Sequence, residues 1–351
     1  MTKPRHIAVI GAGIAGIACA RTLVQAGHRT SVFEKSAGLG GRMATRSSPF
    51  GGFDHGAQYF TVRDPRFSLA LQTAPAVCKP WSASTVRVLD DHGGIAAAGL
   101  PAREAHWVPT PGMAALAAHW AQPLRDAGSL EGETRVTRIE RTSRGAGRWQ
   151  LHTVGPETTD GHRRQVFRGF DDVLLAIPAW QARELLQNSE LADDMAIEID
   201  KVQVAPCWAL MLAFPQAMQP GLNTLGPQWN AARSTHHRIA WLARESSKPG
   251  RDPIERWTVH ASAAWSREHF DDQPDRVQAK LRKAFSEVTG IRAEPAHAQV
   301  HRWAYAQTVQ PLGRSHLWDP SQGIGACGDW CVGHRVEDAF VSGLELALAV
   351  A

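Results

Sequence analysis

A glycine-rich turn near the N-terminus constrains the fold of this 351-residue chain more than any other feature. An apolar run over residues 6–10 leads into Gly-Ala-Gly-Ile-Ala-Gly at 11–16, and an apolar-periodic stretch follows. Gly11 permits a sharp turn, Gly13 lets the backbone approach a pyrophosphate, and Gly16 lets a helix pack closely on a strand. The pattern predicts a strand, a tight turn and a helix whose N-terminal amides bind phosphate.

An acidic residue at the end of the second predicted strand supports a dinucleotide ligand. The first helix is expected to end at Gly27, and a strand over 30–33 runs into Glu34. Glu34 follows Gly11 by 23 residues, close to the roughly 20 expected for a carboxylate that binds a ribose. A glycine turn without a ligand would leave this acid unexplained. The predicted dinucleotide contacts here are Gly11, Ala12, Gly13, Ile14, Ala15, Gly16, Glu34 and Lys35.

A second glycine loop directly after Glu34 indicates which dinucleotide is bound. Residues 35–43 contain Gly40-Gly41-Arg42, where a nicotinamide-binding domain would normally continue into another helix. Arg42 can reach a pyrophosphate as a fixed cation, and an exposed loop cation is the alternative. This loop resembles the second fingerprint of FAD proteins of the flavin amine oxidase and renalase group. Residues 52–60 resemble the segment of that group beside the isoalloxazine ring. The resemblance implies FAD contacts from Gly41, Arg42, His55, Gly56, Ala57 and Gln58.

The resemblance to this group continues to the end of the chain. Residues 111–116 match its P-G-M-x-x-L segment, and residues 328–343 match its C-terminal fingerprint. The resemblance implies that Asp329 binds the ribityl chain or the pyrophosphate side. It also implies that the following helix aims backbone N–H groups at the flavin pyrimidine edge. Many members carry glycine at Asp338, so we expect its carboxylate to face solvent or cap the helix. The further FAD contacts implied are Val136, Gly328, Asp329, Val336, Glu337, Asp338 and Ala339.

The order of the expected elements predicts an α/β fold. A Rossmann-like FAD-binding domain would be joined to a second, mainly antiparallel β substrate domain. The continuous apolar run over 171–178 is typical of a buried parallel strand. Further strands are expected over 202–214, 239–244, 257–262 and 297–303, with helices over 64–78 and 274–288 and a solvated polar loop over 155–165. We assign residues 1–77, 109–190 and 312–351 to the FAD-binding domain, and 78–108 and 191–311 to the substrate domain.

The composition argues against several classes of function. The net charge is +4, with 43% apolar and 21% charged residues and no block of like charges, so we expect no nucleic-acid partner. The apolar run over 204–214 is too short to span a bilayer, and we expect no membrane partner. Five cysteines without a C-x-x-C motif indicate free thiols in a reducing cytoplasm and no metal site.

Within the superfamily, the chain most resembles bacterial renalase-like proteins. The similarity rests on residues 206–211, 241–244, 257–261 and 301–303. It implies oxidation of off-pathway dihydropyridine isomers of NAD(P)H by hydride transfer to flavin N5, with dioxygen as the acceptor and hydrogen peroxide as the product. Such a transfer makes the donor ring aromatic, so it requires positioning and exclusion of water more than a strong base. The group tends to read W-R-Y where this chain has Ala304 between the aromatics, which leaves the contacts to an anionic substrate open.

Three side chains are candidates for contact with the small-molecule substrate. Trp303 and Tyr305 share one face of a strand and could wall the pocket above the flavin, and His260 could touch the substrate. Core packing is the alternative for each of them.

A second hypothesis is a flavin amine oxidase acting on a small amine. The chain has only two tyrosines, so Trp303 with Tyr305 would have to replace the usual paired-tyrosine cage. A third is an FAD-binding protein without turnover. No cysteine lies in a recognisable attachment context, so we expect non-covalent FAD.

Overall fold

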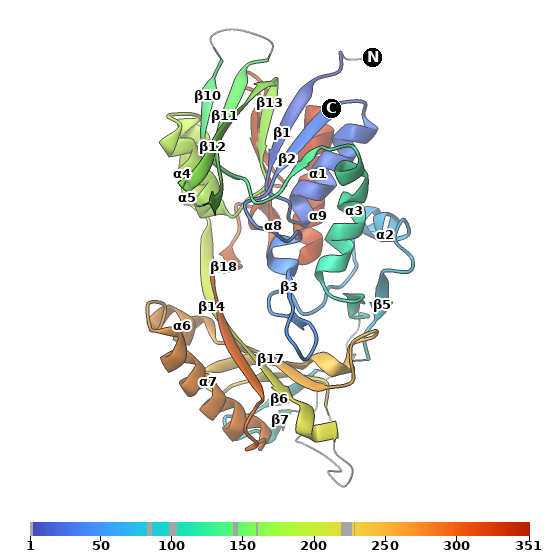
Figure 1. Ribbon diagram of the computed structural model, residues 1–351, viewed down its shortest axis with the longest axis vertical. Helices are drawn as coiled ribbons and strands as arrows, with labels where there is room; N and C mark the ends of the chain where they lie inside the picture. The colour runs from blue at the N-terminus through green and yellow to red at the C-terminus, as the bar shows by residue number, and fades with distance from the viewer. Residues whose placement is uncertain are drawn as a thin grey trace.

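The computed structural model describes residues 3–82, 86–97, 104–142, 147–158, 161–218, 227 and 229–351, and they form two lobes along one long axis (Figure 1). One lobe contains both termini and a six-stranded sheet. The other contains a seven-stranded sheet, from which two long strands, β14 (Gln203–Phe214) and β18 (His297–Gln310), extend toward the first lobe. The strands of the six-stranded sheet, in spatial order, are β19 (Leu317–Asp319), β20 (Ile324–Ala326), β13 (Asp172–Leu175), β1 (His6–Ile10), β2 (Arg29–Phe33) and β9 (Leu130–Glu131).

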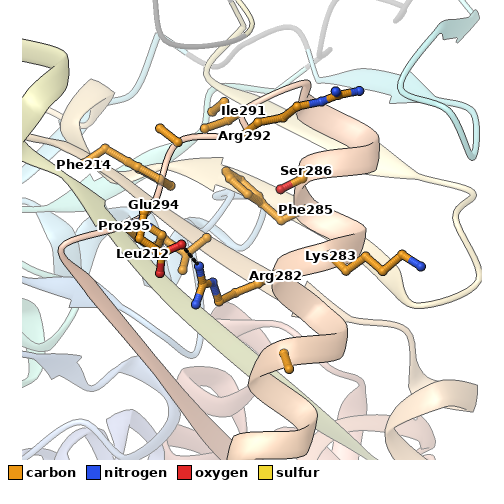
Figure 2. A pocket seen from close by; sticks show the side chains of 12 residues that line it. Leu212, Phe214, Arg282, Lys283, Phe285, Ser286, Ile291, Arg292, Glu294 and Pro295 are labelled. Atoms are coloured by element: carbon orange, nitrogen blue, oxygen red, sulfur yellow. Dashed lines mark hydrogen bonds and ion pairs between the residues drawn. The ribbon is translucent and has the colours of Figure 1, made fainter.

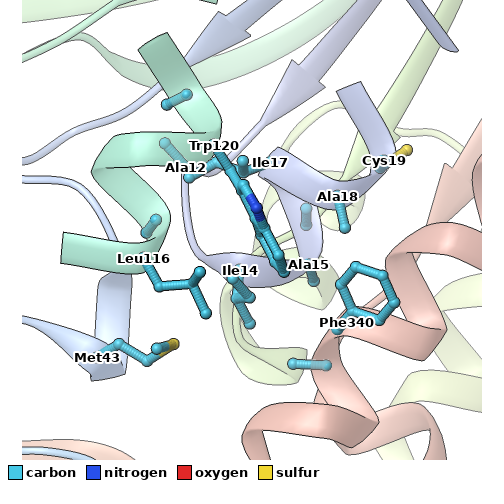
Figure 3. Close-up of a cluster of buried hydrophobic side chains, with 14 of the residues drawn as sticks. Ala12, Ile14, Ala15, Ile17, Ala18, Cys19, Met43, Leu116, Trp120 and Phe340 are labelled. Carbon is cyan, nitrogen blue, oxygen red and sulfur yellow. The ribbon is translucent and has the colours of Figure 1, made fainter. Parts of the chain in front are cut away.

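Both faces of the six-stranded sheet are buried. Strand β1 pairs in parallel with β2 and β13. Its side chains alternate: Ile7 and Val9 pack in one core, Ala8 and Ile10 in the other, as expected for a strand covered on two sides. In the first core, Ile14 and Trp120 lie close to Phe340 (Figure 3). This core contains α1 (Ile14–Gln25), α2 (Pro65–Leu71), α3 (Ala114–Asp126) and α9 (Val336–Val350). The second contains α4 (Ala179–Asn188), α5 (Asp193–Asp200), β10 (Arg135–Arg141), β11 (Trp149–Thr158) and β12 (Gly161–Phe170).

The glycine turn has the geometry that its sequence predicts. Gly11 has a φ of 105°, a left-handed conformation that L side chains rarely adopt. A Cβ on Gly16 would lie 2.0 Å from the carbonyl oxygen of Gly11, so α1 can approach the turn only with glycine there. A Cβ on Gly13 would meet nothing within 4 Å. Close packing therefore requires Gly11 and Gly16, whereas Gly13 faces open space.

The seven-stranded sheet separates a hydrophobic core from a cavity. Residues Leu210, Leu242 and Val259 belong to the core, together with Leu281 and Phe285 of α7. Residues next to them in sequence point to the opposite face, because side chains alternate along a strand. Besides β14 and β18, the sheet contains β17 (Glu255–Ala261), β16 (Ile239–Arg244), β15 (Ala231–Ser234), β6 (Arg87–Leu89) and β7 (Ile95–Ala97), and its core face packs on α6 (Ala263–Glu268) and α7 (Pro274–Thr289).

A buried ionic cluster lies where the two lobes meet. The Lys248 Nζ is 3.0 Å from both Asp54 Oδ2 and Glu245 Oε2, and all three side chains are fully buried. The Arg251 guanidinium donates to the same Asp54 oxygen at 2.7 Å. The short elements near this junction and in the remaining loops are η1 (Gly41–Met43), β3 (Thr45–Arg46), β4 (Phe53–Asp54), β5 (Cys78–Pro80), β8 (Trp107–Pro109), η2 (Pro215–Met218), η3 (Glu245–Ser247) and α8 (Asp329–Val332).

The α/β fold class predicted from the sequence is confirmed, with local differences. Helix α2 ends at Leu71 rather than continuing to residue 78. The polar segment 155–165, expected to be a loop, is largely paired between β11 and β12, because ladder hydrogen bonds do not require apolar side chains. Helix α5 was not anticipated, and it packs against α4. The division into two discontinuous domains remains a proposal. Within the described part of the chain, no helix combines the length and the apolar character that crossing a bilayer requires.

Candidate active site

A cavity of about 1790 Å³ is lined by residues of both lobes. Typical ligand pockets measure about 300–1,000 Å³, so this cavity has room for a long cofactor and a second molecule. One wall is formed by the glycine turn, the loop after β2 and the start of α9, and the other by strands of the seven-stranded sheet. The second cavity described, about 310 Å³ in volume, lies between α7 and the end of β14 (Figure 2). Its Arg282 is paired with Glu294 at 2.6 Å.

The glycine turn and Glu34 form one end of the large cavity. The N-terminus of α1 has no side-chain cap, so its first amides are available to a ligand. The Glu34 carboxylate accepts hydrogen bonds from the backbone N–H of Ala12 and of Ser36, each at 2.9 Å. Each of its oxygens keeps a further acceptor site, because a carboxylate has about four in total. Glu34 is therefore held in a fixed position and can still bind a ribose.

Arg42 and Asp329 bind each other in the middle of the cavity wall. The Arg42 guanidinium donates to both carboxylate oxygens, with Nη1 at 2.9 Å from Oδ2 and a closer contact from Nη2 to Oδ1. Arg42 also donates to the carbonyl of Ala306 at 3.3 Å, and the Thr308 hydroxyl donates to Asp329 at 3.2 Å. Strand β18 thus contacts both members of the pair, of which Arg42 was expected to bind the pyrophosphate and Asp329 the ribityl chain or the pyrophosphate side.

The two acidic residues at the start of α9 are used by the protein itself. Asp338 accepts hydrogen bonds from the backbone N–H of His334 and Arg335 at 3.0 and 2.9 Å, which caps the helix. Glu337 is buried and accepts from the backbone N–H of Arg63 and Asp64, both at 2.6 Å. Neither carboxylate lines the cavity, so what α9 offers a ligand is the backbone of its first turn.

A row of directly opposed residues crosses the cavity face of the seven-stranded sheet. Arg233 on β15 is opposite Trp241 on β16, which is opposite His260 on β17. His260 is in turn opposite Ala209 on β14, which is opposite His301 on β18. Cross-strand partners share a face of the sheet, so all five side chains point the same way. Arg233, Trp241, His260 and His301 line the cavity as its roof.

The carbonyl oxygen of His55 connects the roof to the opposite wall. It accepts hydrogen bonds from His260 Nε2 at 3.1 Å and from Trp303 Nε1 at 3.0 Å. The ring centroids of His55 and His301 lie 4.9 and 4.4 Å from that of Trp303. Because His260 donates through Nε2, its Nδ1 is the unprotonated nitrogen of the neutral ring. These contacts fix the side chains of Trp303 and His260 against the segment formed by residues 55–58.

The imidazoles around Trp303 are neutral at pH 7. Burial lowers the pKa of His55 to about 3, helped by the nearby His301 and Arg46. Burial also lowers the pKa of His260 and of His301 to about 4. The roof near Trp303 therefore carries uncharged rings, which do not repel a cation.

The structure brings nearly all of the predicted site residues to this one cavity. Four of them lie outside its lining, namely Ala12, Gly16, Glu337 and Asp338. The lining residues among those predicted are Gly11, Gly13, Ile14, Ala15, Glu34, Lys35, Gly41, Arg42, His55, Gly56, Ala57, Gln58, Val136, His260, Trp303, Tyr305, Gly328, Asp329, Val336 and Ala339. Their contacts with a ligand remain proposals. No site role was predicted for the lining residues Tyr59, His106, Arg233, Trp241 and His301. Tyr59, Trp241 and His301 lie in segments that resemble the family, whereas His106 and Arg233 lie in none of these segments.

A glycine turn and helix start that open into a large cavity under a β-sheet roof are the architecture expected of a two-lobed, dinucleotide-dependent oxidoreductase. Residues 9–72 match the NAD(P)-binding Rossmann-like domain, and residues 87–351 match the family described as flavin containing amine oxidoreductase. The chain belongs to this family of flavin enzymes. The prediction of an FAD-dependent oxidoreductase is confirmed.

Solved structures of other proteins share the whole architecture. A protein assigned as a protoporphyrinogen oxidase, from Exiguobacterium sp. 255-15, superposes with a TM-score of 0.73 at 14% identity, covering 100% of this chain and 99% of that one. Cyclohexylamine oxidase from Brevibacterium oxydans superposes with a TM-score of 0.69 at 14% identity, with 99% of each chain covered. At such low identity the likeness concerns the fold alone.

Curated relatives match only a short segment. A protein assigned as an L-amino-acid oxidase, YobN of Bacillus subtilis, is 51% identical over 47 residues, which are 13% of this chain and 10% of that protein. The L-amino-acid oxidase of Bungarus fasciatus is 46% identical over 44 residues, 12% of this chain and 8% of its own length. The matches cover about a tenth of these relatives, so they carry no conclusion about a shared substrate.

Proposed function

We propose that this protein is a renalase-like FAD-dependent oxidase that oxidises dihydropyridine isomers of NAD(P)H, with dioxygen as the electron acceptor and hydrogen peroxide as the product. The main observation in support of the proposal is that the His55 carbonyl accepts hydrogen bonds from both Trp303 and His260. It holds the Trp303 indole and the neutral His260 ring over the segment that the family resemblance assigns to the flavin. The cavity is large enough for FAD and a second dinucleotide headgroup to lie together.

The residues of the cavity fit non-covalently bound FAD. The open space beside Gly13 and the uncapped start of α1 suit a pyrophosphate. Glu34 and the backbone of Val136 suit the adenosine end, and Gly328 and the first turn of α9 suit the flavin end. Cys207 is the cysteine among the described lining residues. Burial raises the pKa of its thiol to about 12, which makes it a poor nucleophile for covalent attachment.

The protein side chains have a limited task in this reaction. FAD, when bound, would supply the hydride acceptor and the route of the electrons to dioxygen. Trp303 offers a rigid flat surface that holds the donor ring, and both lobes together exclude water from it. Since the donor becomes aromatic by losing a hydride, no group needs to remove a proton. Neutral histidines are compatible with that requirement.

Oxidation of a small amine is the second candidate function. It is favoured by the family, and by the fold shared with cyclohexylamine oxidase and with a redesigned putrescine oxidase. In the cavity, Trp303 and Tyr305 would provide the aromatic surface. His260 would stay neutral beside the amine, because burial lowers its pKa to about 4. This candidate requires the substrate to bind as a neutral amine.

Anaerobic mixing of the flavin-loaded protein with candidate reductants tests these functions. We expect dihydronicotinamide isomers to bleach the flavin absorbance within seconds, and cyclohexylamine and putrescine to leave it unchanged. Bleaching by an amine but not by the isomers would replace the first proposal with the second. Bleaching by neither class would favour a flavin-binding protein without turnover. Acid precipitation of the same preparation should release all colour, and colour retained in the pellet would contradict non-covalent binding.

A further inference from the structure

The Arg233 end of the roof is not used by the function proposed above. Arg233 lines the cavity with an exposed side chain, at the opposite end of the cross-strand row from His301. In the described part of the chain it forms no ion pair. Burial raises the pKa of the Tyr59 hydroxyl, and the nearby Arg233 guanidinium opposes that shift. A guanidinium in a concave site without a carboxylate partner is a strong donor available to an anion.

Three aromatic side chains form a wall next to Arg233. The ring of Tyr59 lies 4.0 Å from that of His106, with 34° between the planes, and 5.7 Å from that of Trp241, with 40° between the planes. All three line the cavity. Tyr59 follows the segment over 55–58 directly, so this wall continues from the flavin side of the cavity. It offers flat apolar surface to a planar group.

The charges at this end of the cavity favour an anion over a cation. The three arginines Arg63, Arg233 and Arg335 line it together with one acid, Glu104. The Arg63 Nε lies 2.5 Å from Glu104 Oε1, which neutralises that acid. Hydrogen bonding to Arg63 lowers the pKa of Glu104, so it stays ionised and paired. An ammonium group would meet Arg233, which has no carboxylate partner in the described part of the chain, whereas Glu337 and Asp338 lie close to Arg63 without lining the cavity.

We propose that Arg233 and the Tyr59 hydroxyl form an anion-binding subsite, which receives the carboxylate or phosphate of a substrate whose planar ring stacks on Tyr59 and Trp241. The substrate of this chain would therefore be an anion that carries a planar ring. The inference rests on the proposed function only in taking the occupant to be the substrate. Arg233, on β15, would also supply a positive charge in place of the arginine that the renalase-like group tends to carry at the position of Ala304.

Calorimetric titration of the flavin-loaded protein with four benzene derivatives tests the subsite without turnover. The probes are benzoate, phenyl phosphate, neutral benzamide and cationic benzylamine. Charge-assisted hydrogen bonds contribute about 1.5–3 kcal/mol, so we expect at least one of the two anions to bind about 10- to 100-fold more tightly than benzamide. Benzoate as the tighter anion would assign a carboxylate substrate, and phenyl phosphate a phosphorylated one.

Three variants test which residue causes the preference for anions over benzamide. Arg233→Gln should weaken binding of the preferred anion about 10- to 100-fold and leave benzamide unchanged. Tyr59→Phe should weaken the anion several-fold, because one donor is lost and the ring remains. Arg282→Gln removes a cation from the separate cavity beside α7 and should change neither affinity, which controls for net charge.

Three results would overturn the proposal: equal affinity for benzoate, phenyl phosphate and benzamide; unchanged anion binding by Arg233→Gln; or preferential binding of benzylamine. A melting curve within about 2 °C of the parent's would show that Arg233→Gln is folded. These readouts concern ligand affinity, whereas the proposed oxidase activity is judged by flavin bleaching. Either proposal can therefore fail while the other stands.

Discussion

One backbone oxygen, the carbonyl of His55, fixes two of the three side chains that were expected from sequence to touch the substrate. Its partners are Trp303 on β18 and His260 on β17, so both strands depend on the same acceptor. The His55 ring itself is buried, and its Nδ1 has no hydrogen-bond partner among the residues that the structure describes. An orphaned polar atom of this kind in a cavity wall is a position where a bound molecule or a water can donate.

Replacing Trp303 separates a role in the pocket from a role in packing. Trp303→Ala should leave the flavin bound and slow its reduction by a dihydronicotinamide isomer about 10²-fold, because the donor ring loses its near-attack position. Trp303→Phe keeps a flat ring without the N–H and should slow reduction less. Rapid mixing and a thermal melt on both variants provide the measurements. An early melt with an unchanged reduction rate would assign Trp303 to the core instead.

The histidines make stability depend on pH. The pKa of His260 is about 4 in the folded protein against 6.5 for the free side chain, so the unfolded chain binds a proton that the folded one does not. Stability should therefore be complete above pH 6.5 and fall as the pH drops toward 4, by about 1.4 kcal/mol per pH unit for each such histidine. Urea unfolding between pH 4.5 and 7 measures the slope.

A matched pair of variants assigns part of that slope to His260. His260→Gln retains a donor for the His55 carbonyl and cannot titrate, so its slope should be lower by about one proton. His92→Gln changes a histidine with an exposed side chain and should keep the parent slope. If both variants behave alike, His260 is not the group that titrates.

At the scale of elements, prediction from sequence succeeded where the signal was local. The turn at Gly11 and Gly16 and the helix after it follow from spacing within one continuous stretch. The pairing of Arg233 with Trp241 follows from the register of β15 on β16, and neither short strand carries a motif that sets it. Most of the cofactor cradle was therefore predictable, whereas the anion-binding end of the roof was not.

Buried ion pairs hold the loop after η3 to strand β4. Burial alone would raise the pKa of Asp54, but Lys248, Arg251 and hydrogen bonds from Met113 N and Thr45 outweigh it and hold that pKa at about 2. Lys248 also donates to Gln58 Oε1 at 3.2 Å, so the cluster reaches a residue that lines the cavity. The cluster thus ties the position of Gln58 to that of the loop after η3.

Replacing Lys248 should lower the free energy of unfolding. Lys248→Met leaves Asp54 and Glu245 close together in a dry interior, and breaking a buried pair in this way costs about 3–5 kcal/mol of unfolding free energy. Lys201→Met removes one partner of an exposed pair with Glu198 and should cost less than about 1 kcal/mol. Guanidinium unfolding of both variants measures the contrast. Equal losses would show that water reaches the cluster.

At the scale of the molecule, the two lobes meet around the cavity, and β14 and β18 extend from one toward the other (Figure 1). A cofactor bound there contacts both lobes. Ligand binding to the folded state alone adds about 2.7 kcal/mol of stability at a concentration of 100 Kd. The melting temperature of the whole chain should therefore depend on the cofactor.

Differential scanning of cofactor-free protein tests this dependence. FAD should raise the melting temperature, and FMN should raise it less, because it leaves the end near Glu34 empty. Glu34→Ala should reduce the FAD effect, with Glu268→Ala, an exposed acid on α6, as the control. An equal rise with FMN and FAD would contradict the placement of the adenosine half at Glu34.

Side chains of the seven-stranded sheet alternate between the core and the cavity, and this alternation affects how the sequence can evolve. In β15 and β16, Ala232 and Leu242 belong to the core, whereas Arg233 and Trp241 face the cavity. A substitution at Arg233, whose side chain is exposed, can alter which molecule is accepted without removing a core side chain, whereas Trp241 also packs against the first core. A lineage, or a mutant library confined to the cavity-facing positions, can therefore explore new substrates at little cost in folding. Insertion of a single residue in either strand would exchange the two faces and lose both properties at once.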